Sequence, residues 1–195
     1  ERAFGPHHAE VAESLLALAE SYRVQRKMAE AEPLFARALA IREKTLGSEH
    51  PGLVAILIPL AEAYQTQGKL AEAEPVLKRV IGIGEKALGP DDAGVAKIIG
   101  NLGKVYAMQG KYAEAEPLIT RALGIQEKAL GPDHHEVAVS LNDLAEVYYS
   151  RGLYAEAEPL FQRVLAILEK TVGPEHPEVS ASLNNFAALK LAQGR

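Results

Sequence analysis

The chain of 195 residues is 48% hydrophobic and 24% charged, an ordinary balance for a folded protein. Its 21 basic and 26 acidic residues leave a net charge of -5, which argues against a nucleic-acid partner, because binding to nucleic acid depends on basic patches. Zero cysteines exclude disulfides and cysteine-ligated zinc, and no apolar run approaches the roughly 20 residues of a membrane-spanning helix. We therefore expect no membrane partner and a location in the reducing cytoplasm.

Self-similarity at a fixed spacing dominates the sequence. The pentapeptide Ala-Glu-Ala-Glu-Pro ends at Pro33, Pro75, Pro117 and Pro159, always 42 residues apart. Other residue types keep the same spacing, namely Gly5, Gly47, Gly89, Gly131 and Gly173, Tyr22, Tyr64, Tyr106 and Tyr148, and Leu18, Leu60, Leu102 and Leu144. Such a period predicts stacked repeats that bury their apolar faces against one another.

The repeats predict about nine helices in chain order. After residues 1–6, which look like the tail of a preceding unit, the expected helix pairs and a final lone helix span about 9–46, 51–88, 93–130, 135–172 and 177–193. We expect one array over residues 1–195, cut from a longer one. A terminal helix can also serve as a cap of such an array.

Apolar residues in the third repeat follow helical spacing. They recur at steps of three and four, first at Val95, Ile98, Ile99, Leu102, Val105 and Tyr106, then at Tyr112, Ala115, Leu118, Ile119, Ala122 and Leu123. The second stripe continues toward Leu130 and stops at Gly131-Pro132, a typical helix end. We expect Ala-Glu-Ala-Glu-Pro in the first turn of each second helix, where proline is tolerated and glutamates favour the positive end of the dipole.

These residues resemble the tetratricopeptide repeat. The fourth repeat carries its pattern at Leu141, Leu144, Ala145, Tyr148, Gly152, Tyr154, Ala157, Phe161 and Val164. The 42-residue length resembles the kinesin-light-chain and nephrocystin-like subclass, as do the segments 130–134 and 182–185. The resemblance implies an all-α, right-handed solenoid of antiparallel helix pairs. It also implies a non-catalytic scaffold that binds a peptide or partner segment in its concave groove.

The resemblance also implies which residues line the groove. They are Leu16, Glu20, Arg23, Glu62, Gln65, Lys97, Asn101, Lys104, Asn142, Asp143, Glu146, Tyr149, Asn184 and Asn185. Lys97 and Lys104 would form a basic centre between acidic flanks and could meet an acidic residue of a peptide. The carboxylate clamp of chaperone-binding relatives needs lysines at other positions, such as Gly100, which argues against a chaperone C-terminus as ligand.

The asparagines allow two interpretations. Their amides offer donors and acceptors, so Asn101, Asn142, Asn184 and Asn185 can bind the backbone of an extended peptide. They can equally hydrogen-bond between neighbouring helices and set their packing. Both roles remain open from the sequence.

No residue pattern predicts catalysis, a cofactor or a metal. Histidines recur in the linkers at His8, His50, His134 and His176, too far apart to share one ion. His7-His8 and His134-His135 lack a carboxylate at ligand spacing. The chain also lacks a nucleophile elbow, a phosphate-binding glycine loop and a zinc-protease helix. We expect linker histidines with a structural role and no enzymatic activity.

Three further expectations concern departures from the repeat. Pro59 in mid-helix predicts a bend, and Arg26 stands where a left-handed turn favours glycine. The final helix lacks a second helix to cover its apolar residues, which are Leu183, Phe186, Ala187 and Leu191. Self-association through 177–193 would cover them.

The alternative function is a structural, sensor or self-assembling array within a larger multidomain signalling protein.

Overall fold

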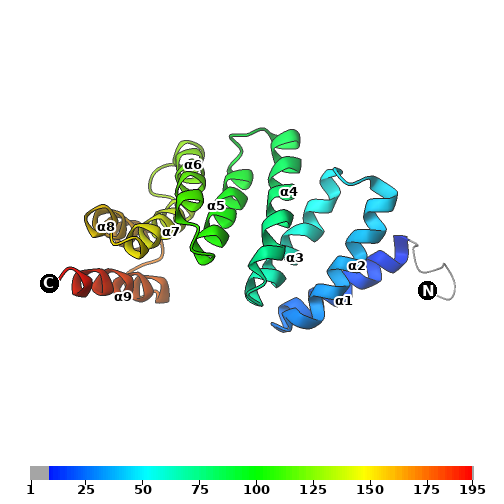
Figure 1. The fold of residues 1–195 in the computed structure, drawn as a ribbon, viewed down its shortest axis with the longest axis horizontal. Coiled ribbons are helices and arrows are strands. Elements are labelled where there is room, and N and C mark those ends of the chain that lie inside the picture. Colours follow the sequence, from blue (N-terminus) through cyan, green and yellow to red (C-terminus); the bar gives the residue numbers. More distant parts are fainter. Residues whose placement is uncertain (1–8, 195) are drawn as a thin grey trace. The chain divides into compact units, whose positions relative to one another are not determined.

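Glycine-containing turns and capped linkers divide the chain into helices. The computed structural model describes residues 9–194, and all regular structure in that range is helical (Figure 1). The elements are α1 Ala9–Val24, α2 Met28–Leu46, the 3-10 turn η1 Pro51–Leu53, α3 Val54–Thr66, α4 Leu70–Leu88, α5 Ala93–Met108, α6 Tyr112–Leu130, α7 His135–Ser150, α8 Tyr154–Thr171 and α9 Pro177–Ala192. The expected tail at 1–6 lies outside the described residues.

The chain divides into two compact units, Glu1–Pro90 and Asp91–Arg195. In the first unit α1 packs on α2, α2 on α3, and α3 on α4. In the second unit α5 to α9 pack in the same sequential way, and α5 also contacts α7. Each unit is therefore a stack of antiparallel helices in which first helices lie on one layer and second helices on the other.

Glycines in the left-handed region end the second helices and make the turns between paired helices. Gly131, for example, has φ 91° and donates its N–H to the Glu127 carbonyl at 3.1 Å. Arg26 adopts φ 59° at the turn where Gly110 and Gly152 have φ 74° and 75°. The left-handed turn thus forms in the first repeat despite its arginine, a conformation uncommon for residues with a Cβ.

The linker histidines cap the helices that follow them. Nδ1 of His50, His134 and His176 accepts the backbone N–H two residues on, at 3.0, 3.2 and 3.3 Å. Asp92 occupies the equivalent position before α5 and accepts two N–H groups, at 2.9 and 3.1 Å. These side chains satisfy donors that have no partner within the helix. The remaining linker histidine, His8, lies outside the described residues.

The repeated prolines do not lie in the first helical turn, so that prediction was wrong. Each second helix begins at the residue before the pentapeptide, which makes Pro33, Pro75, Pro117 and Pro159 the sixth residue of its helix. Each proline therefore removes one internal hydrogen bond. All four are exposed, so water can reach the carbonyl that loses its partner.

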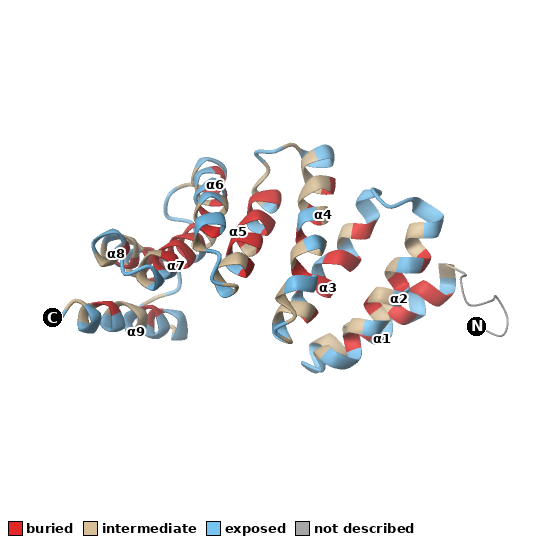
Figure 2. Ribbon diagram, viewed as in Figure 1, coloured by how far each residue is buried: buried red, intermediate tan, exposed pale blue. Residues whose placement is uncertain are grey.

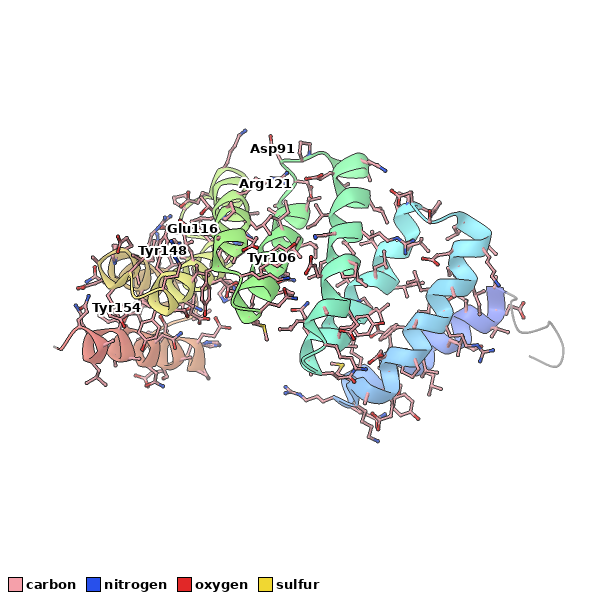
Figure 3. All side chains as sticks on the ribbon, in the orientation of Figure 1. Asp91, Tyr106, Glu116, Arg121, Tyr148 and Tyr154 are labelled. Carbon is pink, nitrogen blue, oxygen red and sulfur yellow. The ribbon has the colours of Figure 1, made fainter. Side chains whose placement is uncertain are left out.

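The second glutamate of the pentapeptide joins successive repeats. Glu32 accepts hydrogen bonds from Gln67 Nε2 at 2.7 Å and from Lys69 Nζ at 2.6 Å. Glu116 accepts from the Tyr148 hydroxyl at 3.1 Å, and Figure 3 shows these two labelled side chains close together. The sequence interpretation of these glutamates as helix-start residues was therefore incomplete, because their carboxylates reach the next first helix.

Buried side chains lie on the helix faces that meet within each unit (Figure 2). The helices α5 and α6 approach each other closely where they cross at Gly103. A Cβ built there would lie 2.6 Å from Ile119 Cγ1 and 3.2 Å from the Ala115 carbonyl oxygen. The fourth repeat has Ala145 at the equivalent position, packed in one cluster with Phe161. Glycine thus makes room for a side chain that branches at Cβ.

The helix that contains Pro59 begins differently from the first helices of other repeats. α3 starts at Val54 after the 3-10 turn, whereas α7 starts directly after its histidine cap. Pro59 is buried within α3, which continues through it as one helix. The bend expected from Pro59 stays a prediction.

Candidate functional site

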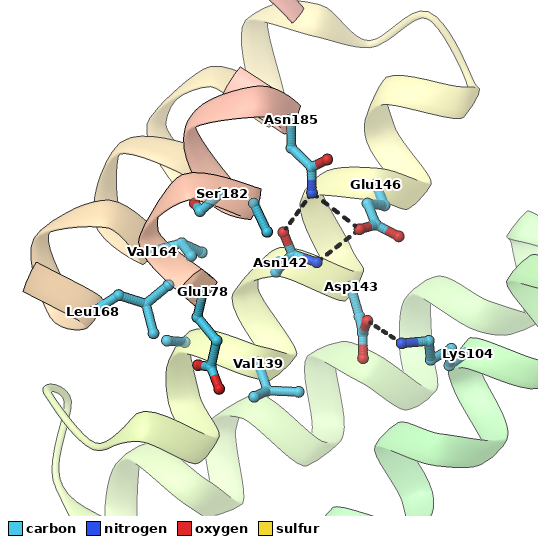
Figure 4. A pocket seen from close by; sticks show the side chains of 12 residues that line it. Lys104, Val139, Asn142, Asp143, Glu146, Val164, Leu168, Glu178, Ser182 and Asn185 are labelled. Carbon is cyan, nitrogen blue, oxygen red and sulfur yellow. Dashed lines mark hydrogen bonds and ion pairs between the residues drawn. The ribbon is translucent and has the colours of Figure 1, made fainter. Parts of the chain in front are cut away.

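A cavity of about 300 Å³ opens in the second unit between α7 and α9 (Figure 4). First helices supply most of its lining, and α8 supplies two apolar residues. The lining comprises Lys104, Ala138, Val139, Asn142, Asp143, Glu146, Val164, Leu168, Glu178, Ala181, Ser182 and Asn185. This volume lies at the lower end of the range for pockets that hold small molecules or single side chains.

Two asparagines and a glutamate form a polar network at one wall of this cavity. Asn142 Nδ2 donates to Glu146 Oε1 at 2.7 Å, and Asn185 Nδ2 donates to Asn142 Oδ1 at 3.2 Å and to Glu146 Oε1 at 3.3 Å. Figure 4 shows the three side chains meeting between α7 and α9. The network ties these helices together, so Asn142 and Asn185 have a packing role.

Asp143 lies beside this network and is only 8% exposed. Its Oδ1 is 3.5 Å from Lys104 Nζ of α5. Burial raises the pKa of this carboxyl from an ordinary 3.8 to about 6, Lys104 opposes the rise, and the nearby Glu146 adds to it. A charge so poorly solvated destabilises the fold at neutral pH unless something else stabilises it.

A second cavity, of about 200 Å³, adjoins the same carboxylates. It is lined by Lys104, Ala107, Met108, Tyr112, Asp143, Glu146 and Ser150. Lys104, Asp143 and Glu146 line both cavities and therefore lie at their junction.

The expected basic centre does not present free positive charge. Lys97 Nζ lies 2.7 Å from Glu136 Oε1, and Lys104 faces Asp143. Both lysines of α5 are therefore matched by carboxylates of α7. Gly100, which the family pattern placed on the groove, is buried near Ala122 and the Ser140 hydroxyl. That position serves helix packing in this repeat.

Expected groove residues in the first unit pair with one another. Arg23 Nε lies 2.8 Å from Glu20 Oε2, and its Nη1 lies 3.3 Å from Glu62 Oε2. Leu16 and Glu20 line a cavity of about 450 Å³ in this unit. Gln65 lies near the end of α3, half-buried and outside that lining.

Besides Lys97, three expected residues of the second unit lie outside the two cavities. Tyr149 is half-buried, with its ring centroid 5.6 Å from that of Tyr154. Asn101 is half-buried on α5, and Asn184 is exposed on α9. The structure thus brings together Lys104, Asn142, Asp143, Glu146 and Asn185 from the fourteen residues proposed from the sequence.

Sequence reasoning missed other residues that line the cavity between α7 and α9. Ser182 is 4% exposed, and its hydroxyl has no hydrogen-bond partner. Glu178 Oε2 lies 2.6 Å from His135 Nε2, and this hydrogen bond lowers the pKa of Glu178. Val139 is an apolar residue with 43% exposure. The spacing of Ser140 and Ser182 offered a weak signal, because only the structure separates the partnered hydroxyl of Ser140 from the unpartnered one of Ser182.

Residues 9–194 show neither a metal-binding cluster nor a membrane-spanning helix. No three histidine, aspartate or glutamate side chains in this range are placed to hold a metal ion together. Within the same range no helix has the length and apolar character needed to span a membrane.

Comparison with known proteins identifies the repeat. The tetratricopeptide repeat model matches residues 10–86, 54–128, 94–170 and 136–195. No curated protein sequence matches the chain. A Podosopora anserina structure of kinesin light chain nearly identical TPR-like repeats is 33% identical, with a TM-score of 0.78 over 96% of this chain and 88% of that chain.

Two further structures share the fold. BtubC (BKLC) from P. vanneervenii is 25% identical, with a TM-score of 0.78 over 95% of this chain and 74% of that one. The apo form of RapI is 21% identical, with a TM-score of 0.74 over 93% of this chain and 47% of that one. The expected all-α solenoid of helix pairs and its kinesin-light-chain-like character are confirmed. The chain belongs to the tetratricopeptide repeat family of protein–protein interaction scaffolds.

Proposed function

We propose that the chain is a non-catalytic scaffold that holds an extended peptide, or a segment of a partner protein, against its first helices. The single observation that carries this proposal is the cavity between α7 and α9, which is lined by amides and carboxylates as well as apolar groups. Such a mixture suits a segment whose backbone and side chains both need partners. A cytoplasmic location and the absence of a cofactor belong to the same proposal.

The amides that line the cavity keep part of their hydrogen-bonding capacity. An asparagine offers two N–H donors and a carbonyl oxygen. The two bonds from Asn185 both leave its Nδ2, so its Oδ1 is available to a peptide N–H. Asn184, one residue earlier, is exposed and can add a further contact. The packing and ligand-binding roles considered for these residues are therefore compatible.

Binding of degenerate nonapeptide pools, followed by fluorescence anisotropy, tests this function. We expect Asn184→Ala to weaken binding without changing the melting temperature, because its side chain is exposed. Asn142→Ala should weaken binding and also lower the melting temperature, because it removes bonds within and between helices. Binding that neither substitution changes would contradict the proposed groove, and so would a complete absence of peptide binding.

Self-association through α9 is a second candidate, favoured by its exposed apolar face. Leu183 is 48% exposed and Leu191 76%. Light scattering coupled to size exclusion, over a concentration series, should give a mass that rises above 21.0 kDa. Leu191→Asp should hold the mass at that of a monomer. Val24→Asp is the matched control, since Val24 is also 76% exposed but lies at the end of α1. A constant mass for the unsubstituted chain would contradict this candidate.

A further inference from the structure

The cavity between α7 and α9 carries more negative than positive charge. Lys104 is the one cationic side chain in its lining, against the carboxylates of Asp143, Glu146 and Glu178. Two of these carboxylates lie against a basic side chain, since Asp143 faces Lys104 and Glu178 contacts His135. In the described part of the chain the third, Glu146, accepts hydrogen bonds only from amide groups.

Glu146 is held in place without being neutralised. Its Oε1 accepts the amide N–H groups of Asn142 and Asn185, and no cationic side chain among the described residues forms an ion pair with it. Neutral donors fix the direction of a carboxylate but leave its charge uncompensated. Its second oxygen, Oε2, accepts none of these bonds. Because Glu146 lines both cavities, this charge lies where they meet.

Ser182 is an independent sign that this region of the protein can bind a polar group. Its side chain is almost fully buried, yet its hydroxyl makes no hydrogen bond in the described structure. A buried polar group without a partner is unfavourable by about 1–3 kcal/mol, so native structures seldom retain one without a reason. Ser182 lines the same cavity as Glu146, so a ligand there would supply the missing partner.

The remaining walls suit an aliphatic chain. Val139 comes from α7, and Val164 and Leu168 come from α8. The long stems of lysine and arginine side chains bury readily on such surfaces while their charged heads reach polar groups. An acidic side chain would meet three carboxylates and one lysine, so charge disfavours it.

We propose that this cavity accepts a basic side chain, lysine or arginine, of the bound segment, with its cationic head at Glu146 and the Ser182 hydroxyl. This inference rests on the proposed peptide-binding function and names the chemistry of its partner. The head would donate to Glu146, and to the hydroxyl oxygen once Ser182 rotates about χ1, because that oxygen has almost no accessible surface in this conformation. Val139, Val164 and Leu168 would cover the stem. Lys104 stays on Asp143 and keeps that carboxylate from competing.

Four fluorescent nonapeptide pools, degenerate except for a fixed central residue, test the proposal on the full chain. The central residue is lysine, arginine, norleucine or glutamate, and norleucine matches the lysine stem without its charge. We expect the lysine and arginine pools to bind at least about tenfold more tightly than the norleucine pool, as a charged hydrogen bond allows. The glutamate pool should bind most weakly.

Substitutions then locate the effect. Glu146→Gln keeps an oxygen acceptor for the two asparagines and should remove most of the preference for lysine over norleucine. Ser182→Ala should reduce the preference while leaving the melting temperature the same or higher, because it removes an unpartnered hydroxyl. Glu114→Gln is the matched control, since Glu114 is an exposed carboxylate of α6 outside the cavity.

The outcomes separate this inference from the function beneath it. Pools that bind equally, or best with glutamate, would overturn the basic-side-chain inference and leave the peptide groove standing. A preference for lysine that survives Glu146→Gln would also overturn it, because the head would then bind elsewhere. If no pool binds at concentrations up to about 1 mM, the peptide-binding function fails as well.

Discussion

The third and fourth helix pairs, α5–α6 and α7–α8, follow one sequence period but solve the same packing problem with different residues. Where α5 crosses α6, glycine faces a β-branched isoleucine, Gly103 against Ile119. Where α7 crosses α8, alanine lies with phenylalanine, Ala145 and Phe161. The period thus fixes the positions at which helices approach, while the residue types change in matched pairs.

The exposed positions of the same two pairs differ without such matching. α5 presents Lys97 and Lys104, whereas α7 presents Asn142 and Glu146 and buries Asp143. Nothing in the crossing of the paired helices requires these residues. The difference teaches that residue types at the buried crossings change together, whereas those at the exposed positions vary from repeat to repeat without such matching.

The largest expected effect is at the α5–α6 crossing. Gly103→Ala should lower the free energy of unfolding by about 2–3 kcal/mol, because the added Cβ meets both Ile119 Cγ1 and the backbone of α6. Urea unfolding followed by circular dichroism measures the loss. Ala145→Gly should cost less, since it leaves only a small gap.

A second substitution sharpens this comparison. Combining Gly103→Ala with Ile119→Leu recreates the pair of the second repeat, where Ala61 and Leu77 are both buried. We expect the double variant to recover most of the lost stability, because the branch moves from Cβ to Cγ. A double variant as unstable as the sum of the two single ones would show that the crossings are not matched pairs.

The next effect has the opposite sign and concerns Asp143. Asp143→Asn should stabilise the fold by about 1–2 kcal/mol at pH 7, because it removes a buried charge. Asparagine already stands at the equivalent positions, Asn101 and Asn185. Urea unfolding at pH 7 tests this, with Asp91→Asn in the exposed linker before α5 as control (Figure 3).

The same carboxyl predicts a pH dependence. Its folded pKa of about 6 lies above the ordinary 3.8, so between these values the folded state holds its proton longer than the unfolded state. The contribution of Asp143 to stability therefore falls as pH rises through this window and stays low above it. Asp143→Asn should remove this contribution. An unchanged difference between the two proteins from pH 4 to pH 7 would contradict the prediction.

The helix caps should give an effect of about 1 kcal/mol. Asp92 accepts two backbone N–H groups at the start of α5, whereas His134 accepts one at the start of α7. Asp92→Ala should therefore cost about 1 kcal/mol, and His134→Ala about half as much. Thermal unfolding of the two variants measures the difference. Equal losses would mean that the second bond of Asp92 adds nothing.

The smallest expected effect concerns the glutamates that join successive repeats. Glu116→Gln weakens the contacts with Tyr148 and Arg151 and should cost less than about 1 kcal/mol, because these groups are partly exposed. The loss should shrink at high salt, as measured by urea unfolding in a salt series. Glu158→Gln, which affects Lys190 of α9, is the companion variant. A loss that salt leaves unchanged would point to the hydrogen bonds rather than to charge.

Most of the fold follows from spacing that is visible in the sequence. A fixed period with apolar residues at steps of three and four requires helix pairs, and glycine at the turns explains where they end. We placed Pro33 in the first turn from its sequence because we interpreted the pentapeptide as the helix start. The helix begins one residue earlier, at Met28, so Pro33 lies beyond the first turn. Local residue preferences identify elements better than they place the first residue of each.

The candidate site was less predictable for a physical reason. Asn101, Asp143 and Asn185 share one register, yet only Asp143 is fully buried. Burial there depends on the side chains that neighbouring helices contribute, which the repeat pattern does not specify. The unpartnered Ser182 hydroxyl likewise depends on which groups come within hydrogen-bond distance. The sequence therefore indicated the helix face on which the cavity lies and five of the residues that line it, but not the burial or the charge of that lining.

Contacts between repeats join residues that lie close together in the sequence, and this affects how fast the chain folds. The hydrogen bonds that join Asn185 to Asn142 and His135 to Glu178, for example, connect residues only 43 positions apart in the sequence. Chains with such local contacts fold quickly, and folding can begin at any helix pair and spread. Unfolding should proceed inward from the ends by the same logic. In amide hydrogen exchange, α9 should therefore lose its protection before α7.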